Sequence, residues 1–315
     1  MIDLVTLAGV IDTFKTRAKT RRRTARRSTL VVVTAPDSRP PRPPAGTATT
    51  GSAYWDGVSE RIAGRYYHDA IIGGLKRDAH LKLIGGWCGD LAGKLVLKTD
   101  LFEEAHGPDQ LLFDLAGPAL RLGIDISPLI ARRAAERGRA DGPRALGCLA
   151  ADVLALPFRA DVFDVIVSNS TLDHFPDPRQ IEAALRELYR VLKPGGTLIV
   201  TLDNPRSLSM LVGAFKRLLR PDPFYLGHTL SRRRLVAALE RIGYEVSGTT
   251  AILHGLENHL SATMGAAQRV GGRRFCRAIG TVLRKLEKLE AAPTRYLTGA
   301  FVAARAVKPI QARER

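Results

Sequence analysis

Residues 163–203 read FDVIVSNSTLDHFPDPRQIEAALRELYRVLKPGGTLIVTLD, and this stretch decides the fold. The apolar run at its start predicts a buried strand over 163–170, and the pattern over 178–192 predicts a helix. A Lys-Pro-Gly-Gly turn follows, in which the two glycines supply the unusual backbone angles of a tight connection. A second apolar strand, 195–203, completes the unit. A strand, a helix and a strand in this order predict a right-handed crossover between parallel strands.

The same alternation continues on both sides of this unit. Beyond it, a helix over Ser231–Ile242 is expected to end at Gly243, a residue type suited to a left-handed C-cap. Strands that alternate with helices predict a parallel sheet covered on both faces. The further strands are expected at 95–97, 121–125, 145–152, 244–253 and 296–307, and the further helices at 108–117, 128–138, 206–221 and 256–290.

The composition is that of a globular protein. Of the 315 residues, 45% are apolar and 25% are charged, which are ordinary values. No apolar run approaches the roughly 18 residues that are needed to cross a bilayer. The three cysteines, Cys88, Cys148 and Cys276, have no paired spacing. We interpret them as reduced thiols of a cytoplasmic protein, and neither disulfides nor a metal site are predicted.

The net charge of +17 is concentrated at the two ends of the chain. Residues 1–53 carry 10 Lys and Arg against 3 Asp and Glu, residues 205–315 carry 20 against 7, and the middle is slightly acidic. Such an asymmetry is consistent with nucleic acid, an anionic membrane or an acidic substrate, and equally with an arginine-rich composition alone. The basic, Pro-rich segment 1–53 is expected to be a disordered tail.

Polar residues stand where the predicted strands end, which is where open parallel sheets bind ligands. Asp125 ends one strand and is followed by Ile126 and Ser127. A carboxylate there can accept hydrogen bonds from both hydroxyls of a ribose, with Ile126 against a base. Alternatively, Asp125 or Ser127 caps the helix that follows. Asp152, after the next strand, can accept from an adenine amino group, and the Val153 N–H can donate to a ring nitrogen.

Four motifs together carry a resemblance to a known family. They read GIDIS, AADVLALPF, FDVIVSNSTLDHFPDP and LRELYRVLKPGGTLIV, and in this order they resemble class I S-adenosylmethionine-dependent methyltransferases. They look most like the branch that methylates quinones and other small metabolites. The resemblance covers about residues 93–253 and the strand 296–307. It implies an α/β, Rossmann-like fold of three layers, with seven mostly parallel strands of which the last is antiparallel.

The resemblance also implies S-adenosyl-L-methionine as the cofactor and assigns roles to single residues. Asp125 would bind the ribose, Ile126 would contact the base, Asp152 would bind the adenine amino group, and Asn169 would lie beneath the methionine moiety. The acceptor implied is a small molecule, lipid-like or related to natural products, whose reacting atom is left open.

The first motif of that family, an acidic, glycine-rich turn after the first strand, is altered. LVLKTDLFEEAHG, residues 95–107, has Lys98 where a carboxylate is usual, and it has no glycine before its end. If the turn works, Asp100 pairs with the ammonium of the cofactor, and Lys98 with its carboxylate or with Asp100. If the turn does not work, a salt bridge between Lys98 and Asp100 closes it to the cofactor, and the protein is a noncatalytic relative of the methyltransferases. A nicotinamide dehydrogenase is disfavoured, because 95–107 holds no G-x-G-x-x-G.

The general-base candidates lie in two loops. His174 is preferred, with Asp173 beside it as the alternative and His228 as a further candidate. Orientation of the reactants can lower the activation free energy by about 7–11 kcal/mol, whereas a general base lowers it by about 3–5 kcal/mol. The loop sequence SNSTLDHF offers no aromatic platform for a flipped base, so a nucleic-acid methyltransferase is the weaker alternative.

The parts outside the common core are expected to shape the acceptor site. Two basic amphipathic stretches, 206–221 and 271–289, are predicted to form a lid, to lie on an anionic membrane, or to pack on the sheet with basic outer faces. Tyr54 and Trp55, in the helical region that precedes the sheet, are expected to belong to the core. No oligomeric state is predicted. The division expected is a tail 1–53, a helical cap 54–93, a methyltransferase core 94–255, a helical insertion 256–295 and a final strand 296–308.

Overall fold

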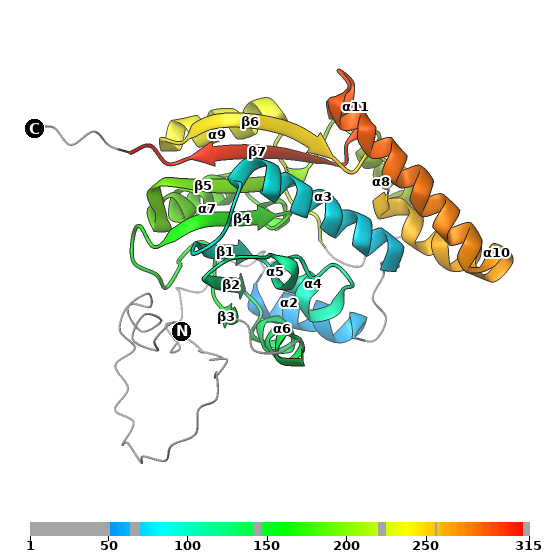
Figure 1. Ribbon diagram of the computed structural model, residues 1–315, viewed down its shortest axis with the longest axis horizontal. Helices are drawn as coiled ribbons and strands as arrows, with labels where there is room; N and C mark the ends of the chain where they lie inside the picture. The colour runs from blue at the N-terminus through cyan, green and yellow to red at the C-terminus, as the bar shows by residue number, and fades with distance from the viewer. Residues whose placement is uncertain (1–50, 64–69, 141–145, 220–224, 256, 311–315) are drawn as a thin grey trace, which may run out of the picture.

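The computed structural model describes residues 51–63, 70–140, 146–219, 225–255 and 257–310. Its centre is a single sheet of seven strands, which are Leu95–Thr99 (β1), Leu120–Asp125 (β2), Leu146–Ala150 (β3), Phe163–Asn169 (β4), Leu192–Asp203 (β5), Glu245–Ile252 (β6) and Phe301–Val307 (β7). They lie in the order β3-β2-β1-β4-β5-β7-β6 (Figure 1). All pairings from β3 to β5 are parallel, and β7 is antiparallel to both of its neighbours. This is the fold that the sequence predicts.

Helices pack on both faces of the sheet (Figure 1). They are Ser52–Ile62 (α2), Ala70–Cys88 (α3), Phe102–His106 (α4), Leu111–Asp114 (α5), Pro128–Ala140 (α6), Pro178–Val191 (α7), Leu208–Leu219 (α8), Arg232–Ile242 (α9), Glu257–Leu286 (α10) and Arg295–Thr298 (α11), with short 3₁₀ turns at Leu172–His174 and Glu287–Ala291. None of the helices in these described segments has the length and apolarity required to cross a membrane.

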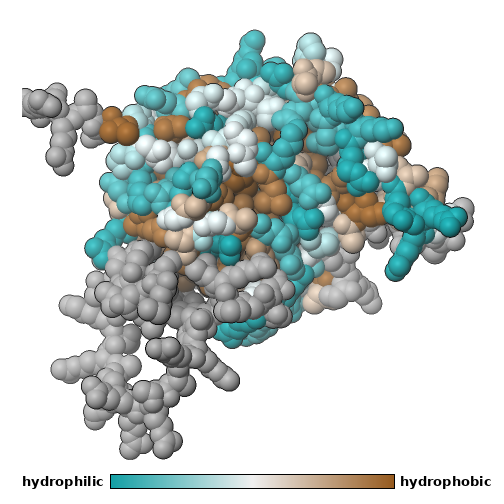
Figure 2. All heavy atoms as spheres, viewed as in Figure 1, coloured by the Kyte–Doolittle hydropathy of each residue, from teal (hydrophilic) through white to brown (hydrophobic). Residues whose placement is uncertain are grey.

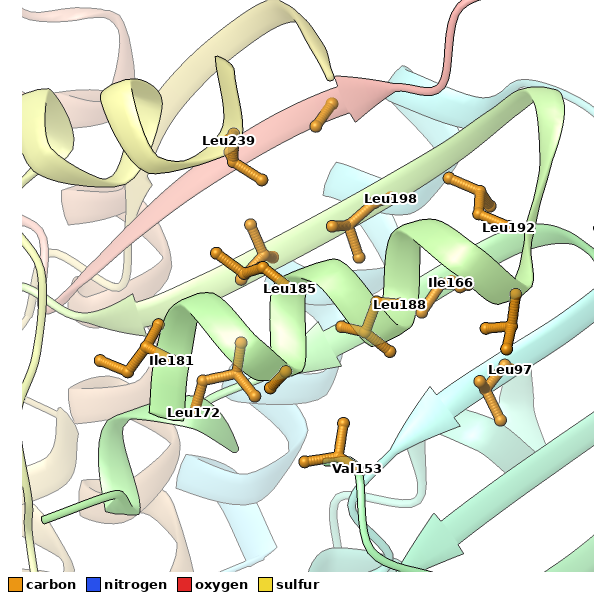
Figure 3. Close-up of a cluster of buried hydrophobic side chains, with 14 of the residues drawn as sticks. Leu97, Val153, Ile166, Leu172, Ile181, Leu185, Leu188, Leu192, Leu198 and Leu239 are labelled. Carbon is orange, nitrogen blue, oxygen red and sulfur yellow. The ribbon is translucent and has the colours of Figure 1, made fainter. Parts of the chain in front are cut away.

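The sheet separates two apolar cores, because neighbouring side chains of a strand point to opposite faces. On β4, Ile166 joins the core that α7 and α9 cover, while Val165 and Val167 join the core beneath α2 to α6. Figure 3 shows Leu185 and Leu188 of α7 lying over the sheet in the first of these cores. The crossover predicted from residues 163–203 is therefore the centre of the molecule.

The ends of the two helices on this face follow from local chemistry. At the start of α7, the Asp177 side chain accepts from the N–H of Arg179, and Pro178 takes the first helical position. At the end of α9, Gly243 adopts φ 110°, the left-handed conformation that a C-cap glycine provides without strain.

Two elements differ from the prediction. The helix expected over 108–117 is replaced by α4 and α5, because a new helix starts directly after the turn that follows β1. The strand expected over 296–307 begins only at Phe301. Before it, the N–H groups of Thr298 and Gly299 donate to the carbonyls of Thr294 and Arg295, in the helical turn of α11 and not across the sheet. The predicted tail, 1–53, lies outside the described residues except for its last three.

Candidate functional site

The order of the strands reverses between β1 and β4, so this is the topological switch point where such sheets bind ligands. Hydroxyl groups join the two strand ends there. Thr99 Oγ1 donates to Ser168 Oγ at 2.9 Å and lies 2.9 Å from Thr171 Oγ1. Thr171 Oγ1 donates in turn to the Thr99 carbonyl at 2.5 Å. These bonds fix the turn after β1 relative to the loop after β4.

The turn after β1 has the backbone of a glycine but carries large side chains. Asp100 adopts φ 144°, a conformation that costs an L residue about 1–3 kcal/mol. Its Oδ1 accepts from the N–H of Phe102 at 2.7 Å, where α4 begins. Leu101 is fully buried, and a Cβ added to Gly123 of β2 would lie 2.3 Å from Leu101 Cδ2. The bulk of Leu101 therefore fills the space that Gly123 leaves, inside the fold.

Lys98 is fully buried and forms an ion pair with Glu104 of α4, with 2.8 Å between Nζ and Oε2. Its Nζ also donates to the backbone carbonyl of Asp100 at 2.5 Å. Burial lowers the pKa of Lys98, but the carboxylates of Glu104 and Asp100 more than offset this effect and raise it. The ion pair thus joins Lys98 to Glu104 where the sequence suggested Asp100, because α4 turns Glu104 back to the end of β1.

Asp125 ends β2 with both carboxylate oxygens bonded to the backbone. Oδ2 accepts from the Leu101 N–H at 3.1 Å, and Oδ1 accepts from the Ser127 N–H at 2.8 Å. Burial, and then the neighbouring Asp100 carboxylate, raise the pKa of Asp125 to about 8. The Ser127 hydroxyl accepts from the Ile130 N–H at 3.0 Å, so Ser127 is the residue that caps α6. Each Asp125 oxygen retains a second lone pair for a ligand.

The remaining residues predicted for the adenosine side lie beside Asp125. Strands β2 and β3 pair through to Asp125 and Ala150, which brings Ile126 and Asp152 to one edge. Asp152 Oδ1 accepts from the Leu154 N–H at 2.9 Å, and burial raises the pKa of this carboxyl. Ile126 is half-buried, whereas the Val153 side chain belongs to the apolar core.

Across the switch point, three buried polar atoms have no hydrogen-bond partner in the described part of the chain: Asn169 Oδ1, Asp173 Oδ1 and Thr201 Oγ1. Asn169 and Thr201 pair across β4 and β5, so two of these atoms come from neighbouring strand ends. The other oxygen of Asp173 accepts from Ser170 Oγ at 3.0 Å and from the Asp203 N–H at 2.8 Å. Because buried polar groups are nearly always bonded, this cluster indicates a place for a polar ligand.

The two candidate histidines lie on segments that contact each other. His174 Nδ1 lies 2.9 Å from the Tyr225 carbonyl. A carbonyl only accepts, so Nδ1 carries the proton and the neutral ring has its lone pair on Nε2. His228 is exposed, and its backbone N–H donates to the Phe175 carbonyl at 2.8 Å. Of the two, His174 is the half-buried one, with its ring centroid 5.0 Å from that of Trp55.

Helix α2 brings residues to the site that the sequence analysis assigned to the core or did not single out. Besides its contact with His174, Trp55 meets the Phe102 ring at 6.1 Å. The Tyr54 hydroxyl accepts from the Tyr225 N–H at 2.6 Å. Asp56 accepts from the Ser127 hydroxyl and from the N–H of Leu129.

The electrostatics of the site favour a cationic ligand. Burial raises the pKa of Asp100 and of Asp125, and each carboxylate is a near neighbour of the other. A positive charge beside them would offset both effects. Within the described residues, no cluster of three or more His, Cys, Asp or Glu side chains could hold a metal ion. An organic cation that also offers hydroxyl donors fits the residues present, and S-adenosyl-L-methionine is such a molecule.

Part of the chain resembles known methyltransferase domains, and its fold is the one that such domains have. Residues 106–200 match the family model described as a methyltransferase domain. The chain is also 33% identical over 141 residues to the ubiquinone/menaquinone biosynthesis C-methyltransferase UbiE of Rhizobium meliloti, and 41% identical over 112 residues to a demethylmenaquinone methyltransferase of Thermus thermophilus. The predicted resemblance to methyltransferases is confirmed. The family match begins at His106, near the end of the altered stretch 95–107, and so leaves out Lys98 and Asp100.

These matches cover part of each protein. They include 43% of this chain and 47% of the Rhizobium protein, and 36% of this chain and 41% of the Thermus protein. The chain thus spans less than half the length of either relative. Among solved structures, a chain in the complex of the Haloferax volcanii Trm112 methyltransferase activator with a methyltransferase has a TM-score of 0.52. That alignment covers 84% of this chain and 100% of the other at 20% identity, which is a likeness of fold.

Proposed function

We propose that this protein binds S-adenosyl-L-methionine and transfers its methyl group to a small-molecule acceptor. The proposal rests on two buried carboxylates, Asp100 and Asp125, and on the unbonded Asn169 Oδ1, all at the switch point of a sheet that resembles methyltransferase domains. These oxygens suit a ligand with hydroxyls at one end and a sulfonium and an ammonium at the other, because hydrogen bonds to charged acceptors are strong.

In the proposed complex, the cofactor lies along the carboxyl edge from β3 to β4. Asp125 accepts from the ribose hydroxyls, and Ile126 packs against the base. Asp152 accepts from the adenine amino group, and the Val153 N–H donates to a ring nitrogen. Asn169 Oδ1, the unbonded atom at the end of β4, accepts from the ammonium of the methionine moiety.

The altered turn has two parts in this arrangement. Asp100 keeps its carboxylate at a strained backbone position, and we assign it to the positive charge of the cofactor. Lys98, which is fully buried against Glu104, stabilises the turn that holds Asp100 and the Leu101 N–H. Its contribution to binding would be made through the turn.

When bound, the cofactor supplies a methyl group that its sulfonium has already activated. The protein then has to align the acceptor with that group and exclude water. Alignment alone can lower the activation free energy by about 7–11 kcal/mol. Helix α2 covers this edge with Trp55 beside His174. His174 Nε2, which carries the lone pair of the neutral ring, would take the proton of an acceptor that loses one. Asp173 orients the loop through Ser170 and Asp203, and His228 is the second candidate base.

A planar or partly apolar acceptor fits the aromatic side chains at this edge, Tyr54, Trp55 and Phe102. Two relatives are named for quinone methylation, and their names support an acceptor of that general kind. We propose a cytoplasmic location for the protein. We also propose that 94–255 with 296–308 is the catalytic unit, and that 54–93 and 256–295 shape the acceptor site.

Calorimetric titration with S-adenosyl-L-methionine tests the proposal. We expect a Kd in the micromolar range, about −8 kcal/mol. Asp125→Asn should weaken binding about 100-fold, because two hydrogen bonds to a charged acceptor are lost. Asp78→Asn, which changes an exposed carboxylate on α3, is the matched control and should leave the affinity unchanged. No heat at millimolar cofactor, from a protein with a cooperative unfolding transition, would overturn the proposal.

The second candidate function is that of a noncatalytic methyltransferase-like protein. It is favoured by one observation, the internal ion pair between Lys98 and Glu104 that occupies the turn after β1. The titration separates the two candidates, because a protein with a closed turn binds no cofactor.

A further inference from the structure

Exposed apolar side chains are concentrated on three helices, α8, α10 and α11. In the part of the chain that the structure describes, seven large hydrophobic side chains are exposed, and six of them lie on α8, α10 and α11. The six, between 50% and 67% exposed, are Leu208, Leu211, Phe215, Phe275, Val282 and Leu297. Soluble surfaces show such residues singly, so a group of six calls for a partner.

The three helices form one region of the molecule. Helix α8 contacts both α10 and α11, and Figure 1 shows all three gathered at the same end of the sheet. Within α8, Leu208 and Phe215 are seven residues apart, and so are Phe275 and Val282 within α10. Seven residues make two helical turns, so each pair lies on one side of its helix. Helices α8 and α10 therefore each present an apolar ridge outward, and α11 adds Leu297.

The same region is strongly basic. Residues 271–289 hold six Lys and Arg side chains and one acidic residue, Glu287. Arg273, Arg274 and Arg277 are exposed beside Phe275. Glu287 is directed inward and accepts from the N–H groups of Leu253 and His254. Figure 2 shows hydrophobic and strongly hydrophilic residues interleaved over the α10 end of the molecule. Among the side chains of α10 that the structure describes, the exposed charge beside the apolar ridge is therefore positive.

We propose that the surface formed by α8, α10 and α11 binds an anionic phospholipid bilayer. Apolar side chains of an interfacial helix enter the boundary between headgroups and acyl chains, while arginines on the polar side contact anionic headgroups. Both features are present here, and the helices need not span the bilayer. This contact goes beyond the proposed function and holds whether or not the site transfers a methyl group.

The charge favours lipid over the other occupants of an apolar face. A second copy of the chain would bring the same arginines face to face, and like charges across an interface cost several kcal/mol. Nucleic acid would satisfy the arginines, but it would leave the aliphatic side chains Leu208, Leu211 and Val282 without an apolar partner. A bilayer satisfies both sets at once.

Vesicle flotation of the full chain tests the proposal. Vesicles of phosphatidylcholine with about 30 mol% phosphatidylglycerol should bind the protein at 0.1 M salt, and pure phosphatidylcholine should not. Binding should weaken at 1 M salt, where the Debye length falls from about 10 Å to about 3 Å. Phe215→Trp should show blue-shifted emission on the anionic vesicles and quenching by brominated acyl chains.

Variants separate this surface from the rest of the chain. Leu211→Glu/Phe215→Glu should reduce vesicle binding at least about 10-fold, and Arg273→Gln/Arg274→Gln/Arg277→Gln about 100-fold, at roughly five-fold per lost charge. Ile310→Glu, at the seventh exposed apolar position, is the matched control and should bind as the unmodified chain does. All variants should keep the same cofactor titration, which distinguishes a failure here from a failure of the proposed function.

Three results would overturn the proposal. The first is absence of binding to anionic vesicles at 0.1 M salt. The second is binding that neither set of variants reduces, which would assign it to another basic part of the chain. The third is another occupant of this surface. It would be seen as a dimer in sedimentation velocity, or as binding to a DNA or RNA duplex that is tighter than binding to vesicles. In either case the Leu211→Glu/Phe215→Glu variant would abolish the dimer or the duplex binding.

Discussion

The turn after β1 and the ends of β4 and β5 are neighbours at one edge of the sheet, yet they differ in how far their buried polar groups are hydrogen-bonded. In the turn, Lys98, Glu104 and Asp100 are bonded to one another or to the backbone. At the ends of β4 and β5, the buried atoms Asn169 Oδ1 and Thr201 Oγ1 have no described partner. The difference teaches that the ion pair of Lys98 and Glu104 holds the turn in place, whereas the ends of β4 and β5 keep buried oxygens that the proposed cofactor would bond.

The largest effect should come from the buried ion pair. Lys98→Met leaves the Glu104 carboxylate buried without a counter-charge, so we expect the free energy of unfolding to fall by about 3–5 kcal/mol. Urea unfolding followed by circular dichroism measures it. Lys82→Met, in an exposed pair with Glu290, should cost less than about 1 kcal/mol.

A double variant sharpens the same test. Glu104→Gln removes the charge that Lys98→Met leaves behind, and it keeps an oxygen for the Leu112 N–H, which Glu104 Oε1 now accepts at 2.9 Å. The double variant should recover at least about half of the lost stability. A Lys98→Met protein as stable as the unmodified chain would remove the contrast between the two regions.

The second effect concerns two asparagines near the ends of neighbouring strands. Asn204 donates to the carbonyls of Tyr296 and Gly299 and accepts from the Arg206 N–H, so Asn204→Ala should cost about 2 kcal/mol of stability. Asn169 Oδ1 is unbonded. Asn169→Ala should therefore cost less than about 1 kcal/mol and weaken cofactor binding about 10-fold. Equal behaviour of the two variants in unfolding and titration would argue against a ligand at β4.

The third test separates strain from function. Asp100→Gly relieves a strained backbone but loses the bond to the Phe102 N–H, so stability should change by less than about 1 kcal/mol. Cofactor affinity should fall about 10-fold, because a carboxylate beside the cation is removed. Asp161→Gly, at another aspartate with positive φ, should leave the affinity unchanged. If Asp100→Gly bound as tightly as the unmodified chain, the carboxylate would have no part in the site.

The last test is a pH dependence carried by Asp125. Its pKa of about 8 means that it is mostly protonated at pH 6 and mostly ionised at pH 9. Ribose hydroxyls bind better to the ionised form, so affinity should rise over that range. Titrations of Asp125→Asn at both pH values subtract the ionisation of the cofactor itself, and this variant should lack the Asp125 component.

Stability responds to the same group with the opposite sign. The folded-state pKa of Asp125 lies above the unfolded value of about 3.9, so the native state binds the proton more tightly. The contribution of Asp125 is therefore fully present below about pH 4 and is lost as pH rises toward 8. Relative to the unmodified chain, Asp125→Asn should be more stable at pH 9 than at pH 5, as measured by urea unfolding. No difference between the two values would contradict the raised pKa.

Much of the fold was predictable because its determinants are local. Apolar runs predicted the strands, the spacing of Ile181, Leu185 and Leu188 predicted α7, and Ser231 and Gly243 marked the bounds of α9. The failures were also physical. The prediction of a helix over 108–117 missed that a helix already starts at Phe102. The prediction of a strand from residue 296 missed that the N–H groups of Thr298 and Gly299 bond along the helical turn of α11.

The site was predictable only in part. Asp125, Asp152 and Asn169 follow strands, so their place at the carboxyl edge followed from the order of the elements. The partner of Lys98 was missed, because Glu104 is brought back by a helix that the sequence analysis placed elsewhere. Tyr54 and Trp55 pack against the core as expected, but the contact between Trp55 and His174 was missed, because nothing in the spacing of the α2 residues relates the two.

By itself, the sequence determined the alternating strands and helices, the methyltransferase motifs and the basic character of the C-terminal third. Each of these features depends on residues that are close in the chain, through periodicity, turn chemistry and charge. Only the tertiary structure decided which polar groups are bonded and which are buried without a described partner, and which apolar side chains remain exposed on α8, α10 and α11. Hydrogen bonds and burial join residues that are distant in the chain, and no local pattern encodes such a pairing.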